Sequence, residues 1–291
     1  MLRYPGAVTP TRDAATIMLV RDAPAGAPAG VEVCMLRRNL EAEFVAGAYV
    51  FPGGSVDPAD ARPEMATVCR GLTDADASAL LGVPSGGLAL WVAALRECFE
   101  EAGVLLASPA GAPEGELVDF GDAEVATRFG AHRAALNGSE ADLLEICRQE
   151  DLVLAADTVH YVSHWITPAG LPKRFDTRFF VAPAPPGQVA RHDAGETIAD
   201  IWIRPADALD RHRAGEIQLM PPTIDNLENL GRWRTTEEVV AWARSIEDVP
   251  TVLPIVRSGG GRVVVYRPED PGYQELLAEE EAAGRAPAGA G

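Results

Sequence analysis

The chain has 291 residues, of which 47% are hydrophobic, enough for one large domain or two small ones. Its formal net charge of −18 argues against nonspecific nucleic-acid binding, which draws on lysine and arginine, and gives no reason to expect attachment to an anionic membrane. The sequence has no secretion signal and no run of the ~18 apolar residues that would span a bilayer, so we expect a soluble cytoplasmic protein.

Two short apolar runs near the N-terminus, Ala14 to Arg21 and Val31 to Arg37, have the length and pattern of strands. The Pro/Gly/Ala-rich stretch between them predicts a hairpin. A third short strand, Ala48 to Phe51, leads into Gly53-Gly54, where glycines permit a tight turn and a close approach to the backbone. Residues 61–87 then predict two short helices, which form an insertion.

The clearest helical pattern runs from Leu88 to Leu106. At ~100° per residue its apolar side chains fall in one stripe, formed by Leu88, Val92, Leu95, Phe99 and Ala102. Glu97, Glu100 and Glu101 fall on the opposite face, because residues three and four apart are neighbours on a helix. Three adjacent carboxylates repel one another, and a hard divalent cation that prefers oxygen ligands relieves that repulsion.

The remaining chain alternates helices and strands. Residues 107–150 begin with a Pro/Gly-rich loop and carry two helical patterns, which predict a second helical insertion. Val159 to Thr167 and Arg174 to Ala182 predict a strand hairpin, and Ile198 to Ile203 predicts a strand followed by a helix. Beyond them the sequence predicts helix over 222–246, a hairpin over 252–266 and a flexible tail over 276–291.

The segment from Arg96 to Val104, RECFEEAGV, resembles the second half of the Nudix hydrolase box, R-E-U-x-E-E-x-G-U, where U is apolar. Upstream, FPGGSVDPAD resembles the first half, with Asp60 where the family usually has Glu. A long insertion separates the two halves here. The resemblance implies an α+β fold, an α/β/α sandwich with a mixed central sheet flanked by helices. It also implies a single domain over residues 1–275, with helical insertions at about 61–87 and 107–150.

Functional groups follow from the same resemblance. It implies that Mg²⁺ or Mn²⁺ is bound by the Gly53 carbonyl, Glu97, Glu100 and Glu101. We expect Arg96 to pair with an acid of the box, such as Asp60, and to orient the ligands. Glu196, which precedes the strand that closes the fold, is the candidate for an extra ligand or general base. The sequence leaves open whether Glu97 or Glu196 is the general base.

Nudix enzymes cleave a nucleoside diphosphate linked to another group. The residues Arg38-Asn39, Gly47 and Phe51-Pro52-Gly53-Gly54 are similar to a coenzyme A diphosphatase motif, R-S-x3-R-x3-G-x3-F-P-G-G. Asn39 replaces the Ser of that motif and Glu43 replaces its second Arg. The interrupted box and the later WITPAGLPKRFDTRFF are similar to the branch that contains peroxisomal coenzyme A diphosphatases and bacterial relatives.

Coenzyme A or acyl-coenzyme A is therefore the expected substrate. The alternatives are ADP-ribose, NADH or a dinucleoside polyphosphate, a catalytically idle nucleotide-binding Nudix domain, and an acidic interaction protein. The residues expected to contact substrate are Arg37, Arg38, Phe51, Gly54, Lys173, Arg174 and Arg178. We expect a small-molecule nucleoside diphosphate derivative as the partner, and we expect no binding to nucleic acid or to a membrane. The sequence leaves the oligomeric state open and is compatible with a homodimer.

Overall fold

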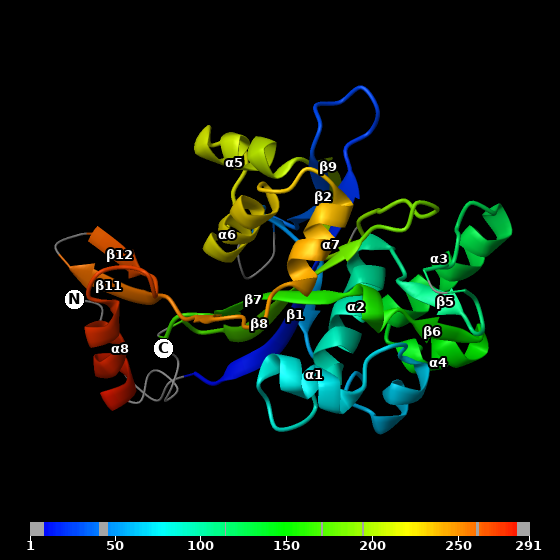
Figure 1. The fold of residues 1–291 in the computed structure, drawn as a ribbon, viewed down its shortest axis with the longest axis horizontal. Helices are drawn as coiled ribbons and strands as arrows, with labels where there is room; N and C mark the ends of the chain where they lie inside the picture. The colour runs from blue at the N-terminus through cyan, green and yellow to red at the C-terminus, as the bar shows by residue number, and fades with distance from the viewer. Residues whose placement is uncertain are drawn as a thin grey trace.

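The computed structural model describes residues 9–40, 46–113, 115–169, 171–193, 195–259 and 262–283. Its main sheet has eight strands (Figure 1): β1 (Thr11–Asp22), β2 (Val31–Arg38), β3 (Tyr49–Val50), β4 (Gly53–Ser55), β7 (His160–Ile166), β8 (Arg174–Pro183), β9 (Thr197–Ile203) and β10 (Thr251–Val252). The order is β10-β7-β8-β1-β2-β3, with β4 on β1 and β9 on β2. Because β1 pairs with β8 in parallel and with β2 antiparallel, the sheet is mixed, as expected.

Strand β1 is buried on both faces, which explains its continuous apolar run. Ile17 and Leu19 belong to one hydrophobic core, and Met18 and Val20 belong to the other. This alternation follows from the two-residue period of a strand. The sheet therefore separates two cores, and each core needs its own layer of helices.

Helices cover both faces of the sheet (Figure 1). One core contains residues of α1 (Asp74–Leu81), α2 (Leu88–Ala102), α3 (Ala123–Asn137) and α4 (Leu143–Gln149). The other contains residues of α5 (Pro205–Arg213), α6 (Pro221–Leu230) and α7 (Thr236–Arg244). The α/β/α sandwich is confirmed. The predicted helix over 222–246 is divided, because Gly231 ends α6 and the Thr235 side chain caps α7.

Helix α2 lies against the sheet as its apolar stripe predicts, and all five stripe residues are buried. Trp91, which is also buried, fixes its position. The indole N–H donates to the Val159 carbonyl at 2.9 Å, and the ring packs against Phe180 with centroids 4.7 Å apart. One side chain thus fastens the helix to the strand layer by both packing and a hydrogen bond.

The first insertion supplies the N-terminal cap of α2. Its first predicted helix is a 3₁₀ turn, η1 (Pro63–Val68), and its second is α1. Gly87 precedes α2 and has no side chain to cap it. Instead, Asp74 of α1 accepts from the Leu88 N–H, and Ser78 accepts from the Gly87 N–H, both at 3.0 Å. The insertion therefore satisfies backbone donors that every helix start leaves open.

The second insertion packs at the flank of α2 and contacts the first. It contains α3, α4 and a strand pair that the sequence did not predict, β5 (Ala107–Pro109) with β6 (Leu152–Leu154). Strands of this length are too short to show an alternating pattern. Arg62 of the first insertion pairs with Asp142 of the second at 2.5 Å. A second 3₁₀ turn, η2 (Ala156–Thr158), leads into β7.

The C-terminal part differs from the predicted tail. The expected hairpin is formed by β11 (Ile255–Gly259) and β12 (Arg262–Tyr266), with residues 260–261 outside the described part. Helix α8 (Tyr273–Ala282) then crosses the predicted boundary at residue 275. Tyr273 and Leu277 are buried, and the Tyr273 hydroxyl donates to the Leu253 carbonyl at 2.8 Å. The helix therefore extends into the predicted tail up to residue 282, because these contacts hold it; residues 284–291 lie outside the described part.

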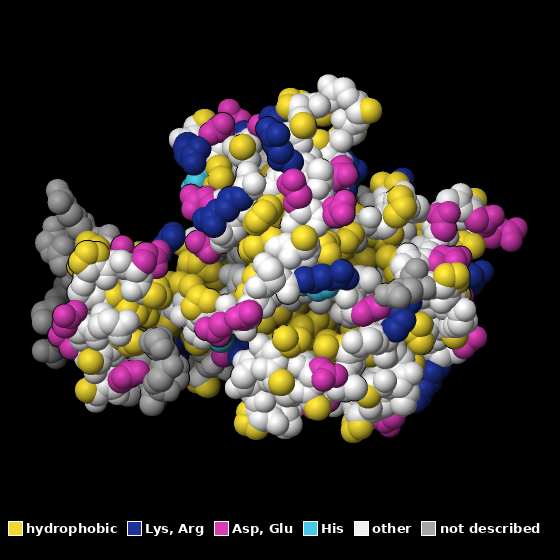
Figure 2. All heavy atoms as spheres, in the orientation of Figure 1, with side chains coloured by type: hydrophobic (Ala, Val, Ile, Leu, Met, Phe, Trp, Pro, Cys, Tyr) yellow, Lys and Arg dark blue, Asp and Glu magenta, His cyan; other side chains and the backbone are white. Residues whose placement is uncertain are grey.

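Charged side chains of both signs are mixed on the surface. On the face shown in Figure 2, Asp and Glu side chains are spread over the helices, with Lys and Arg scattered among them. None of the described helices is both long enough and apolar enough to cross a membrane.

Trp91→Ala tests how α2 is held. We expect the free energy of unfolding to fall by about 3–5 kcal/mol, because a large buried ring and its hydrogen bond are lost. Trp91→Phe should cost less, since it keeps a ring against Phe180. Urea unfolding followed by circular dichroism measures both. A loss below about 1 kcal/mol in Trp91→Ala would show that other contacts hold the helix.

Candidate active site

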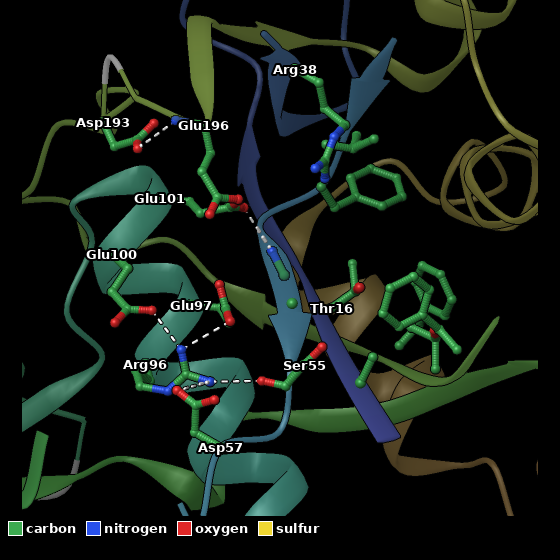
Figure 3. A pocket seen from close by; sticks show the side chains of 18 of the residues that line it. Thr16, Arg38, Ser55, Asp57, Arg96, Glu97, Glu100, Glu101, Asp193 and Glu196 are labelled. Atoms are coloured by element: carbon green, nitrogen blue, oxygen red, sulfur yellow. Dashed lines mark hydrogen bonds and ion pairs between the residues drawn. The ribbon is translucent and has the colours of Figure 1, made fainter. Parts of the chain in front are cut away.

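A pocket of about 830 Å³ opens beside the carboxylate face of α2. Figure 3 shows that its polar residues come from α2, from β4 and from the loop before β9. This wall includes Arg96, Glu97, Glu100, Glu101, Asp193 and Glu196. The apolar lining includes Phe51, Phe175, Phe179, Met220 and Pro222. All five expected catalytic residues therefore lie in one cavity.

Arg96 is the centre of the polar wall, and the expected pair with Asp60 is confirmed. The two side chains are buried and bind through two hydrogen bonds, from Nε at 2.9 Å and from Nη2 at 3.0 Å. Nη1 also donates to Glu97 at 2.9 Å and to Glu100 at 2.6 Å. One guanidinium thus fixes three carboxylates. Removing it would leave Asp60 as a buried charge without its partner, which is costly.

The carboxylates of the pocket raise one another's pKa. Burial, opposed by Arg96 and reinforced by Glu100 and Glu196, raises the pKa of Glu97 from its usual 4.5 to about 7. Burial and the charge of Glu97 raise the pKa of Glu101 well above its ordinary value, although the Gly53 N–H donates to it at 2.9 Å. The charged forms of Glu97 and Glu101 are therefore disfavoured in this pocket, and a bound cation would favour them.

The two glycines of the first half-box are needed for close approach. Instead of the expected tight turn, they form strand β4, in which Gly53 pairs with Thr16 and Gly54 pairs with Ala15 of β1. A Cβ on Gly53 would lie 2.6 Å from the Ala15 carbonyl oxygen. A Cβ on Gly54 would lie 2.7 Å from the Glu97 carboxyl carbon. Any side chain here would displace either the sheet or the carboxylate.

The loop before β9 carries Glu196 into the pocket. Asp193 accepts hydrogen bonds from the backbone N–H groups of Glu196 and Thr197, both at 2.9 Å. On the other side, the Asn39 N–H donates to the Glu196 carbonyl at 2.9 Å, and its side chain donates to the Gly195 carbonyl at 3.2 Å. Asn39, a departure from the expected motif, thus helps to hold this loop; Glu43, the other departure, lies outside the described residues.

The donor chemistry of the pocket fits a hard cation, because several carboxylates that repel one another converge on one cavity. As the side chains stand, no three His, Cys, Asp or Glu residues of the described part form a metal-binding cluster. Arg96 holds Glu97 and Glu100 in ion pairs instead. The donor set fits a cation, and Glu97 and Glu100 would have to turn partly away from Arg96 to join it.

Three of the seven expected substrate contacts line the pocket: Arg38, Phe51 and Gly54. Arg38 is the basic residue among them. Its Nε is buried without a hydrogen-bond partner in the described structure, and Figure 3 shows its side chain reaching toward the pocket from the strand layer. A buried donor of this kind is costly unless a ligand supplies an acceptor.

The structure does not bring the other four basic residues of the expected cluster to this pocket: its described lining does not include Arg37, Lys173, Arg174 or Arg178. Arg174 is buried and donates to the carbonyls of Thr167 and Thr9, both at 3.0 Å. Arg178 is buried beside Asp176. These two arginines hold the β7–β8 hairpin and the start of β1, a role that the sequence alone cannot separate from phosphate binding.

Other residues that line or support the pocket were not predicted from the sequence, among them Asn137, Asp193 and Arg133. The spacing of Asp193 and Thr197, an acid followed by a hydroxyl within one loop, is a local signal for a turn held by the side chain. Asn137 and Arg133 come from the second insertion and contact the far end of α2. Their partners are distant in sequence, so no local pattern could have revealed them.

A family model described as the NUDT19 Nudix domain matches residues 73–230, which is more than half of the chain. The chain is 26% identical to an acyl-coenzyme A diphosphatase NUDT19 of Gallus gallus, over 91% of this chain and 80% of that protein. It is 27% identical to the Homo sapiens protein of the same name, over 84% of this chain and 73% of that protein.

A crystal structure of a NUDIX hydrolase from Alicyclobacillus acidocaldarius shares the fold, with 28% identity and a TM-score of 0.63, and covers 81% of this chain and 97% of that one. The sandwich, the box and the pocket define the class as the Nudix hydrolases, which act as pyrophosphatases and generally use divalent metals. Within that class, the chain belongs to the family of NUDT19 Nudix domains.

The raised pKa of Glu97 predicts a pH dependence of stability in the absence of metal. The folded protein favours the protonated form of Glu97. The contribution of this form to the unfolding free energy is fully present below the usual pKa of 4.5 and is lost as pH rises through about 7. In EDTA, the unfolding free energy of the wild type should therefore fall between about pH 5 and pH 8. Glu97→Gln should show a smaller fall, and the exposed-site control Glu237→Gln should follow the wild type. Equal slopes in all three proteins would contradict this assignment.

Proposed function

We propose that this protein uses Mg²⁺ or Mn²⁺ to hydrolyse the diphosphate of coenzyme A or acyl-coenzyme A. The products would be 3′,5′-ADP and 4′-phosphopantetheine or its acyl derivative. The observation that carries the proposal is a single pocket that joins the carboxylate face of α2 to an apolar wall. Relatives in chicken and human whose names give them this activity support the choice of substrate.

The chemistry assigned to the residues is attack of water on phosphorus, with cleavage of the bond to the bridging oxygen. A bound divalent cation would supply charge neutralisation and a more acidic water. Glu97, Glu100, Glu101 and the Gly53 carbonyl are the proposed ligands. Arg96 keeps Glu97 and Glu100 at the pocket wall through hydrogen bonds of 2.9 and 2.6 Å, which would open partly as the two carboxylates turn toward a cation. Either Glu97 or Glu196 takes the proton of the attacking water.

The rest of the pocket suits the two ends of such a substrate. Arg38, with its unpaired buried Nε, can donate to a phosphate oxygen. The aromatic side chains of Phe51, Phe175 and Phe179 offer an apolar surface for the pantetheine chain or the acyl group. The cytoplasmic location and the homodimer expected from the sequence stay predictions.

A substrate panel with and without Mg²⁺ or Mn²⁺, followed by product mass, tests the activity. We expect metal-dependent release of 3′,5′-ADP from coenzyme A and acyl-coenzyme A. Preferential cleavage of ADP-ribose, NADH or a dinucleoside polyphosphate would replace the proposed substrate. No cleavage of any diphosphate would favour the idle nucleotide-binding domain.

Glu100→Gln and Glu101→Gln test the proposed ligands. Each should lower kcat by about two orders of magnitude or more with the fold intact, because a neutral amide binds a hard cation more weakly than a carboxylate. Glu237→Gln, on the exposed surface of α7, serves as the control. Circular dichroism establishes folding, and wild-type rates in either variant would refute the site.

Arg38→Met tests whether the basic residue that lines the pocket, and not those outside it, binds the substrate. We expect KM for coenzyme A to rise about tenfold, because a charged hydrogen bond to phosphate is lost, with a smaller change in kcat. Lys173→Met, at the β7–β8 hairpin, should leave KM unchanged. The reverse result, a raised KM in Lys173→Met alone, would restore the expectation drawn from the sequence and contradict the placement of the pocket.

A further inference from the structure

The second insertion contacts the end of α2 through one half-buried cation. Arg133 of α3 donates from Nε to the Glu100 carbonyl at 2.9 Å and from Nη2 to the Glu101 carbonyl at 2.8 Å. The same Nη2 donates to the Arg191 carbonyl at 2.9 Å. Asn137, one turn further along α3, adds a bond of 3.3 Å to the Glu100 carbonyl. A single guanidinium therefore binds three backbone carbonyls from two separate segments.

The end of α2 is built to receive this group. The last carbonyls of a helix lack partners within the helix, and a positive charge there is favourable because of the helix dipole. Gly103 ends α2 with a left-handed backbone, at φ +68°. A Cβ at this position would lie 2.7 Å from Nη1 of Arg133. Glycine is thus required here both by the backbone angle and by the space that the guanidinium occupies.

The third bond links the helix to the loop that carries Glu196. Arg191 lies just before Asp193, which accepts the hydrogen bonds that shape this loop. Glu101 and Glu196 face each other across the gap between the two segments (Figure 3). Carboxylates on separate segments would move apart unless the segments were tied together. Arg133 ties them from one side, and Asn39 holds the loop from the other.

We propose that Arg133 is a positioning residue for the hydrolysis. It sets the separation of the Glu101 and Glu196 carboxylates, and thereby the affinity of the pocket for a divalent cation. The proposal rests on the proposed function of the site. Arg133 acts through the backbone, because it is not among the described residues that line the pocket. On this account the second insertion supports the catalytic site and is not only an addition to the surface of the protein.

A neighbour on the same helix provides a matched control. Arg128 is exposed and pairs with Glu150 at 3.0 Å, away from the end of α2. Its replacement removes one positive charge from α3, as the Arg133 replacement does, and an ion pair besides, but leaves all three carbonyl contacts in place. Any effect that comes from a general loosening of α3 should appear in both variants.

The experiment compares Arg133→Met, Arg133→Lys and Arg128→Met with the wild type in the full chain. Mn²⁺ binding is measured without substrate by the electron paramagnetic resonance of the free ion. Steady-state kinetics on coenzyme A give kcat and KM, and thermal unfolding gives stability. We expect Arg133→Met to weaken Mn²⁺ binding and to lower kcat by about 10- to 100-fold, with KM little changed, as for residues that orient metal ligands.

Arg133→Lys should fall between Arg133→Met and the wild type, since a lysine keeps the charge but cannot form the same fork of bonds. Arg128→Met should match the wild type in Mn²⁺ affinity and kcat. Wild-type Mn²⁺ affinity and kcat in a folded Arg133→Met would overturn the proposal. If Arg133→Met does not fold, the same measurements on Arg133→Lys decide, and wild-type values there would overturn it equally.

The two proposals fail separately. If the wild type binds Mn²⁺ but does not cleave coenzyme A, the substrate assignment fails while the Mn²⁺ titration still tests Arg133. If the wild type cleaves coenzyme A and the Arg133 variants bind Mn²⁺ normally, only the positioning role is lost.

Discussion

Repulsion among carboxylates that converge on one pocket is the constraint to which the rest of this structure responds. Glu97 and Glu101 lie on one helix and Glu196 lies on a loop distant in sequence, yet all three line the same cavity, and the charges nearby help to raise the pKa of Glu97 and of Glu101. Such a group keeps its shape only if the segments that carry it are held by contacts elsewhere. Helix α2 is accordingly held along its side by Trp91 and across its polar face by Arg96.

The two helical insertions, one inside the box and one after it, fit this picture. A long insertion costs little when its ends stay close, so length alone does not harm the site. The first insertion returns Asp74 to the start of α2, and the second returns Arg133 to its end. Side chains that cap a helix from outside fix its position as well as its length. The extra helices therefore hold the catalytic helix at both termini, where its own sequence offers only Gly87 and Gly103.

Local patterns in the sequence predicted most of the helices and strands, whereas the resemblance to the Nudix box predicted the sandwich and the centre of the site. The stripe from Leu88 to Ala102 follows from periodicity, and the pair of Arg96 with Asp60 was expected from the matched box. Arg174 and Arg178 were misplaced, since a basic side chain looks the same whether it binds phosphate or holds a hairpin. Arg133 was missed because its partners are carbonyl groups, which every residue possesses and no sequence pattern marks.

The parallel pairing of β1 with β8 has a consequence for how the chain is made. Thr11 pairs with Arg174, so the first strand emerges from the ribosome long before its central neighbour exists. Until β8 has been made, the hairpin of β1 and β2 has an unpaired edge and apolar residues on both faces. Such a hairpin is prone to wrong association between nascent chains. Contacts this remote in sequence also make folding slow. Yield during synthesis, more than stability once folded, is thus the property that this topology puts at risk.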